Sequence, residues 1–163
     1  MFETVVLIAQ TVSVAAIAFW LATGVYDNIR YPLNNELFTA QVLSFERMRH
    51  DFPEEFARVA HRAIERRSTQ LWAFRIAVLA ELAACLVLIA GTVALLMALA
   101  GTGDIDTGRA VALLGATMFT AIWAGFLIVG NYFCYWFCHE GAQNTHYQMT
   151  LWGLGTMIFL VVG

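Results

Sequence analysis

The stretch most suggestive of chemistry is residues 131–140, NYFCYWFCHE, where two cysteines, a histidine and a glutamate lie among aromatic side chains. Cys134 and Cys138 are four positions apart, so they would share one face of a helix. Together with His139 and His146 they could supply thiolate and imidazole ligands to copper or zinc. The same composition is also typical of the end of a membrane span, where Tyr and Trp lie at the lipid headgroups. We favour this second interpretation and expect neither a metal nor another cofactor.

A second candidate is Glu81, an acid within an otherwise apolar stretch. It follows Leu71 by ten positions, which corresponds to a depth of about 15 Å at helical rise. A charge at that depth costs several kcal/mol unless it is neutralised, paired or beside a cavity. Asn131 would lie at a similar depth, so we hypothesise a Glu81–Asn131 hydrogen bond that Tyr132 could extend. Two roles stay open for Glu81: a structural hydrogen bond between helices, or a site for a proton or ligand.

The composition indicates a membrane protein. Of 163 residues, 60% are hydrophobic and only 13% are charged, whereas about a quarter of the residues in a soluble domain are charged. The nine basic residues are all arginines and form no long basic run, so nucleic acid is not expected as a partner. The three cysteines lie in or beside apolar runs, and no disulfide framework is predicted.

Four apolar stretches are predicted to cross the membrane as helices, since a span needs about 20 mainly apolar residues. They are residues 4–25, 71–100, 109–138 and 147–162. The second and third exceed the thickness of the hydrocarbon and must tilt or project beyond it. The fourth is short, and a re-entrant segment is its alternative. The predicted fold class is therefore all-α, with residues 1–163 forming one integral membrane four-helix bundle.

Small and polar residues on these stretches predict close contacts between the helices. Gln10 and Ser13 are three positions apart on the first span, so they could form hydrogen bonds with a neighbouring helix. Small side chains would let backbones approach one another. These small residues are Ala80, Ala84, Ala112, Gly115, Ala116, Ala124 and Gly125.

Residues 26–70 form the long polar segment of the chain and carry seven of its nine arginines. Arginine is enriched in cytoplasmic segments beside spans, which places this segment in the cytoplasm and both termini outside. Two amphipathic helices are predicted in it, beginning after Asn34 or Asn35 and after Asp51. They would lie in the interface plane and form a collar on the bundle. The candidate contacts with a partner are Arg58, Arg62, Arg66, Arg67 and Trp136.

The layout resembles a bacterial family described as predicted small integral membrane proteins (domain of unknown function 2165), of which this chain would be a divergent member. The similarity lies in the segment YDNIRYPLNNELFTAQVLSFERM, in the acid of the second span, and in the glycine and aromatic residues ending the third. The positions that fit the family pattern are Val42, Leu43, Ser44, Glu46 and Glu81. The family tends to have histidine at the position of Gln41 and an acid at that of Asn131. The resemblance implies four spans and adds no activity.

No catalytic constellation is found, so an enzyme is not expected. The first hypothesis is a non-catalytic accessory subunit of a larger complex in the bacterial inner membrane. Its spans and collar would contact the lipid bilayer and stabilise or recruit other integral membrane subunits. The second is a small transport component in which Glu81 binds a proton or a substrate. The third is a metal or redox protein that uses Cys134, Cys138 and His139.

Overall fold

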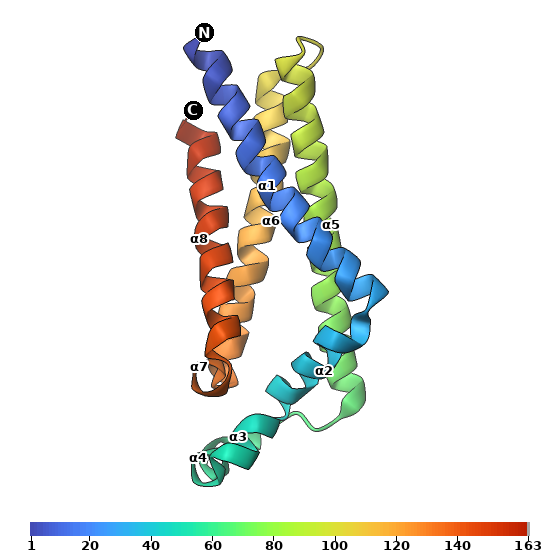
Figure 1. The fold of residues 1–163 in the computed structure, drawn as a ribbon, viewed down its shortest axis with the longest axis vertical. Coiled ribbons are helices and arrows are strands. Elements are labelled where there is room, and N and C mark those ends of the chain that lie inside the picture. Colours follow the sequence, from blue (N-terminus) through green and yellow to red (C-terminus); the bar gives the residue numbers. More distant parts are fainter. Residues whose placement is uncertain (163) are drawn as a thin grey trace.

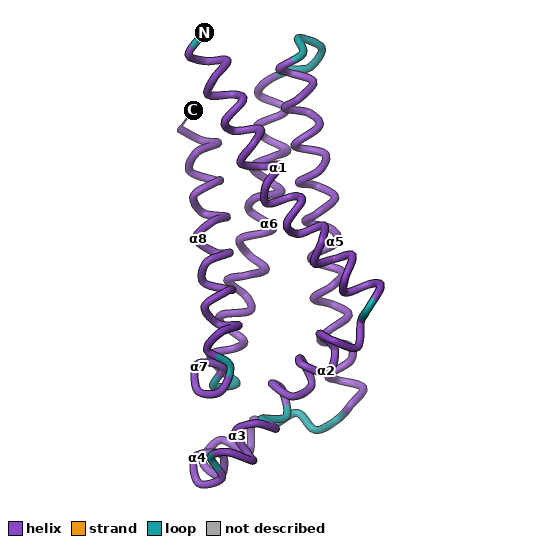
Figure 2. Tube along the Cα trace, viewed as in Figure 1, coloured by secondary structure: helices purple, strands orange, loops and turns teal. Residues whose placement is uncertain are grey.

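The structure is a computed structural model that describes residues 1–162, and over that range it is helical and contains no strand. Four long helices lie side by side, with both chain termini at one end of the bundle (Figure 1). They are α1 (Phe2–Arg30), α5 (Arg67–Leu99), α6 (Ile105–Tyr132) and α8 (Glu140–Val162). Short helices make the connections at the opposite end (Figure 2). They are α2 (Pro32–Leu43), α3 (Glu46–Asp51), α4 (Pro53–Val59), the 3-10 helix η1 (Ala60–Arg62) and α7 (Tyr135–Cys138).

Three of the described helices, α1, α5 and α6, are long and apolar enough to cross a membrane. The sequence predicted four such helices. The fourth, α8, has 23 residues and packs against α6 and α1. Its first half carries Glu140, Gln143, Asn144 and His146, so its apolar part is short. A fourth crossing therefore stays a prediction.

The helices are packed most closely toward the end of the bundle that holds the termini. A Cβ atom added to Gly91 of α5 would lie 2.6 Å from the Cα atom of Ala112 on α6. One turn deeper, Gly115 of α6 fits in the same way against Leu88. Gly153 of α8 lies against α6 with no room for a side chain. These contacts confirm that small residues bring the helices together here, and we call this region the packed half.

Polar side chains also join the helices of the packed half, as predicted for Gln10 and Ser13. Nε2 of Gln10 donates to the carbonyl oxygen of Phe159 at 2.9 Å, and Gln10 is fully buried. Oε1 of the Gln10 side chain accepts from Nε of Arg109 at 3.0 Å. The hydroxyls of Ser13 and Thr156 are 3.1 Å apart. Side-chain hydrogen bonds thus connect α1 to both α6 and α8.

The third long helix is shorter than predicted. It ends at Tyr132, not at Cys138, because Phe133 leaves the helical conformation and Cys134 adopts a left-handed backbone with φ of 52°. Such a residue interrupts the ladder of i to i−4 hydrogen bonds. The buried Phe133 ring contacts Phe45 at a centroid distance of 5.6 Å, so tertiary packing accompanies the break. The prediction that Cys134 and Cys138 share one helix is wrong.

The collar, residues 26–70, also differs in detail from its prediction. Its first helix begins at Pro32 and not after Asn34 or Asn35, and left-handed Phe45 (φ of 55°) divides it from α3. The second begins at Pro53, with Phe52 rather than Asp51 at the N-cap, and gives way to η1 after Val59. Three short α-helices and one 3-10 helix thus replace the two predicted helices. Apolar side chains of the collar form a second core cluster together with Phe133, which follows α6. Its buried members are Leu43, Phe45, Met48 and Phe133.

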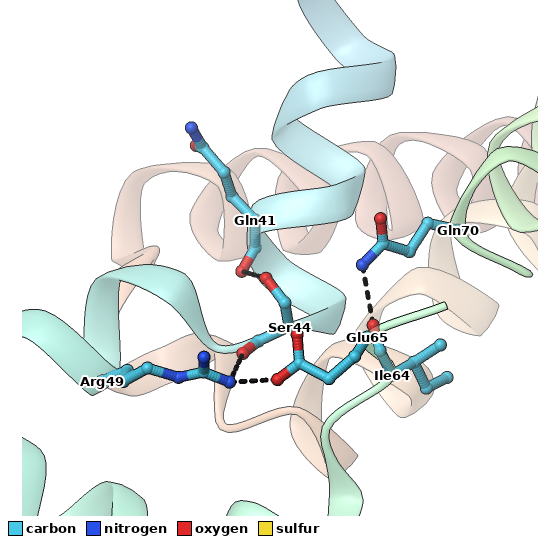
Figure 3. Close-up of polar contacts among 6 residues, drawn as sticks. All are labelled: Gln41, Ser44, Arg49, Ile64, Glu65 and Gln70. Carbon is cyan, nitrogen blue, oxygen red and sulfur yellow. Dashed lines mark hydrogen bonds and ion pairs between the residues drawn. The ribbon is translucent and has the colours of Figure 1, made fainter. Parts of the chain in front are cut away.

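Hydrogen bonds fasten the collar to the start of α5 (Figure 3). The amide of Ile64 donates to the carbonyl oxygen of Leu43 at 2.9 Å. Nε2 of Gln70, a buried residue of α5, donates to the carbonyl oxygen of Ile64 at 2.7 Å. Arg49 and Glu65 form an ion pair beside them. The stretch before α5 is therefore joined by hydrogen bonds both to the end of α2 and to Gln70 of α5.

A candidate binding cavity around Glu81

Away from the packed half, α5 diverges from α6 and α8 (Figure 1). A cavity of about 710 Å³ lies in this region, and its walls come from α1, α2, α5, α6, α7 and α8. Most lining side chains are apolar, with a few polar groups among them. Small-molecule sites typically have volumes of about 300–1,000 Å³ and this kind of lining. We call this region the open half.

Glu81 lines the cavity from α5 and is only 6% exposed. Nδ2 of Asn28, near the end of α1, donates to Oε2 of Glu81 at 2.9 Å. Oδ1 of Asn28 in turn accepts from Nδ2 of Asn35 on α2, at 2.5 Å. Asn35 therefore orients the Asn28 amide so that its NH₂ group faces the carboxylate. Sequence reasoning missed both asparagines as partners of Glu81, since it gave Asn35 only as a possible helix cap and did not single out Asn28.

The predicted hydrogen bond between Glu81 and Asn131 is wrong. Asn131 is exposed and lies beside Gln143 and Tyr147 in a separate hollow of about 250 Å³. Asn131 was predicted at the same depth as Glu81, but successive side chains of an α-helix point in directions about 100° apart. Gly130 is buried and lines the cavity, so the next residue points away from it. Rotation about the α6 axis, not depth, decides the outcome.

Tyr132 does not extend the Glu81 network either. Its side chain is exposed, and its carbonyl oxygen accepts from Nη1 of Arg62 at 3.2 Å. The Arg62 guanidinium also lies 5.1 Å from the centroid of the Tyr132 ring. Tyr132 thus connects the end of α6 to the collar.

Aromatic rings from five elements form a continuous wall of the cavity. The Trp20 and Trp123 centroids are 5.3 Å apart, and Trp123 lies 5.3 Å from His146. The His146 ring stacks on Tyr135 at 5.5 Å, and Tyr135 contacts Phe38 at 6.4 Å. All five residues line the cavity. Rings from α1, α6, α8, α7 and α2 are thereby joined, and we call them the aromatic wall.

The charges around the cavity are unbalanced. Among the described residues that line it, the ionisable groups are Glu81, Tyr135 and His146, and no arginine is present. Burial raises the pKa of Tyr135 to about 12, so its hydroxyl stays neutral at physiological pH. Nε1 of Trp123 and Nδ1 of His146 are buried and have no hydrogen-bond partner within residues 1–162. The cavity thus presents one carboxyl group, neutral polar atoms and aromatic surface.

The four candidate metal ligands are not brought together. Burial raises the pKa of the Cys138 thiol, which opposes formation of a thiolate. His139 stacks on Tyr135 at 5.5 Å, and His146 lies on the cavity wall. Cys134 is the N-cap of α7 and Cys138 is the last residue of this helix. Over the described part of the chain, no group of three or more His, Cys, Asp or Glu residues is close enough to hold a metal ion.

The candidate partner contacts divide into two groups. Arg62 and Arg67 bind the chain itself, since Arg62 contacts Tyr132 and Arg67 pairs with Glu36 of α2. The others are exposed on the surface around the collar and α7. These exposed residues are Arg58, Arg66 and Trp136.

An all-helical chain with three apolar helices of this length is an integral membrane protein. The chain belongs to the family of predicted small integral membrane proteins (domain of unknown function 2165), whose family profile matches residues 6–163. The resemblance seen in the sequence is therefore confirmed. No curated protein and no solved structure matches this chain. An activity has to be argued from the cavity itself.

Proposed function

We propose that this protein is a non-catalytic component of a membrane transport system, in which the cavity of the open half binds a small ligand and Glu81 selects it. The observation that carries the proposal is the position of a buried carboxyl group on the wall of a cavity of about 710 Å³. An acid within a membrane is costly, and such residues generally mark paths for substrates or protons. The Asn35–Asn28 pair holds a donor against this acid, and the remaining lining is mostly apolar.

We further propose that α8 crosses the membrane over residues 147–162, in a multi-pass protein of the bacterial cytoplasmic membrane with both termini outside. Three observations support this arrangement. The termini lie at the same end of the bundle, and α8 runs along α6 (Figure 1). The collar, which carries seven of the nine arginines, lies at the opposite end, and arginine-rich segments stay in the cytoplasm. Topology reporters would place Glu3 outside and Glu54 in the cytoplasm in this arrangement, and they would give the reverse result if the collar were outside.

The function is tested by comparing solute uptake in cells that lack the gene with uptake in cells complemented by variants. Glu81→Gln keeps the shape of the side chain and an acceptor for Asn28 but removes the charge. We expect the wild type to restore uptake of a solute and Glu81→Gln to fail, at equal amounts of membrane-inserted protein. The control is Glu54→Gln, a carboxyl-to-amide change at an exposed position of the collar. Full restoration by Glu81→Gln would contradict the proposal.

A second candidate function is the accessory subunit of a larger inner-membrane complex. It is favoured by the exposed Arg58, Arg66 and Trp136, which lie where a cytoplasmic or membrane partner could bind. Purification from native membranes in mild detergent should then recover a defined partner. Arg58→Ala with Arg66→Ala should lose that partner while Glu81→Gln retains it. A chain that elutes alone would argue against this function.

A further inference from the structure

We propose that the cavity of the open half binds a free organic cation with an apolar body, whose charge lies beside Glu81 and whose body contacts the aromatic wall. The inference rests on the proposed function, which assigns a ligand to this cavity. It adds the chemical class of that ligand. Three features of the described residues lead to it.

The first feature is the sign of the charge on the wall. The chain has nine arginines, yet none is among the residues that line the cavity, whereas Glu81 is. Asn28 donates one hydrogen bond to the Glu81 carboxyl, which has room for further donors because an ionised carboxylate offers about four acceptor sites. A poorly solvated carboxylate strongly attracts a cation and repels an anion. An anionic ligand would find no arginine on this wall to compensate its charge.

The second feature is a set of cavity-lining rings over which no arginine lies in the described chain. Arginine guanidinium groups lie over four aromatic rings in the described chain, those of Tyr31, Trp72, Phe56 and Tyr132. None of these four rings lines the cavity. The aromatic wall, with two tryptophans among its members, therefore has no arginine over its rings in the described chain. Aromatic faces attract organic cations, and tryptophan does so best.

The third feature separates a free cation from a lipid headgroup. The ammonium group of phosphatidylethanolamine is attached to a phosphate, which needs a basic partner or many donors. The lining of the cavity supplies Asn28, Asn35, Thr39 and Thr145 as neutral polar groups, and no arginine. A cation with an apolar body matches this lining better than a zwitterionic headgroup does. The volume of about 710 Å³ accommodates a drug-sized molecule.

The test uses two probes that have nearly the same shape and opposite charge, tetraphenylphosphonium and tetraphenylborate. Binding to the purified full-length protein would be measured by equilibrium dialysis, with tryptophan fluorescence as a second signal because Trp20 and Trp123 belong to the wall. The protein would be held in nanodiscs of phosphatidylglycerol and, in a second arm, of phosphatidylethanolamine. Three forms are compared: the wild type, Glu81→Gln and Gly125→Leu. Gly125 lines the cavity, and a Cβ atom there meets nothing within 4 Å, so leucine would fill the space without disturbing the helix contacts.

We expect the wild type to bind the phosphonium at least about tenfold more tightly than the borate. Glu81→Gln should weaken phosphonium binding by at least about tenfold, because a charge pair in a poorly solvated site is lost. Gly125→Leu should abolish it, with unchanged helicity and thermal stability in both variants. The ratio of the wild-type affinity to the Glu81→Gln affinity should be the same in both lipids, since the negative surface of phosphatidylglycerol attracts the phosphonium equally in both cases.

The possible failures are distinguishable. If the borate binds better and Gly125→Leu abolishes that binding, the cavity has a ligand and the proposed function survives, but the cationic class is wrong. Equal phosphonium binding by the wild type and Glu81→Gln also overturns the class. Loss of binding only in phosphatidylethanolamine would show that its headgroup competes for the site, which overturns the assignment to a free cation. If neither probe binds in either lipid, the inference and the proposed function fail together.

Discussion

The packed half and the open half are built from the same long helices, but these helices are in close contact in the first and enclose a cavity in the second. In the packed half, Gly91 and Gly153 lie so close to α6 that an added Cβ atom would clash with it. Gln10 satisfies its polar groups by hydrogen bonds to α8 and to Arg109 of α6. In the open half, Trp123 and Phe126 of α6 face a cavity, and α5 presents an acid to it. One region uses its polar groups to join helices, and the other exposes them to a space of ligand size.

The comparison shows that the type of residue does not by itself decide its role. Gly115 packs against Leu88, whereas Gly125, ten positions further along α6, faces the cavity, where an added Cβ atom would meet nothing within 4 Å. Both were expected to bring helices together, and this is wrong for Gly125. Glycine permits a close approach where the opposite helix is near, and it leaves a space where that helix has diverged.

The sharpest test of the comparison is the same substitution, glycine to alanine, in each half. Gly91→Ala should lower the free energy of unfolding by about 2–3 kcal/mol, because its Cβ would lie 2.6 Å from the Ala112 Cα and the backbones must separate. Gly125→Ala should be neutral or stabilising by up to about 1 kcal/mol, since alanine favours the helix and meets open space. Thermal or denaturant unfolding in detergent measures both. Equal effects would mean that the two halves do not differ in packing.

A second test addresses the polar network of the open half. Asn28→Ala removes the donor to the buried Glu81 carboxyl and should destabilise the protein by about 1–3 kcal/mol. In a Glu81→Leu background the same change should cost much less, so a double-mutant cycle isolates the pair. Asn34→Ala, an exposed asparagine of α2, is the control and should have little effect. Additive losses would show that Asn28 and Glu81 are not coupled.

His139, which stacks on Tyr135 of the aromatic wall, should make the stability of the protein depend on pH. Burial lowers the pKa of His139, and the positive charge of Arg47 lowers it further. The unfolded chain therefore binds a proton at this position more readily than the folded one, and stability should fall as the pH drops below about 6.5. His139→Gln should flatten this part of a melting-temperature profile, whereas His61→Gln, at an exposed position, should not. An unchanged profile in His139→Gln would contradict the assignment.

The smallest expected effect concerns the contact between the collar and α6. Arg62→Ala loses a hydrogen bond to the Tyr132 carbonyl oxygen and the contact with its ring, both near solvent. A loss of about 0.5–1 kcal/mol is expected. Arg58→Ala, an exposed position on α4, should change stability by less. In limited proteolysis, the collar of the Arg62→Ala variant should be cleaved faster than that of the Arg58→Ala variant. A larger effect of Arg58→Ala would contradict the interpretation that Arg62 joins the collar to α6 and that Arg58 does not.

Much of the fold could be predicted, because long apolar stretches indicate helices in the membrane and arginine-rich segments indicate parts of the chain outside it. The helices α1 and α5 were placed correctly except for a few terminal residues, and the collar was recognised as helical. The breaks at Phe45 and Cys134 were missed, since a left-handed backbone at a residue other than glycine is imposed by packing and not by local preference. The site was predicted only in part. Glu81 was singled out correctly as a buried polar residue, but the prediction that Asn131 is its partner was wrong.

The sequence by itself determined that this is a membrane protein, how many long helices it has and that one of them carries an acid deep within it. These properties follow from composition and from runs of apolar residues, which a chain carries whatever its tertiary structure. Only the tertiary structure decided that Asn28 and Asn35 reach this acid, that the rings of five elements form one wall, and that a cavity separates α5 from α6. The physical reason is that rotation and divergence of packed helices depend on contacts between residues far apart in the chain, which no local pattern contains.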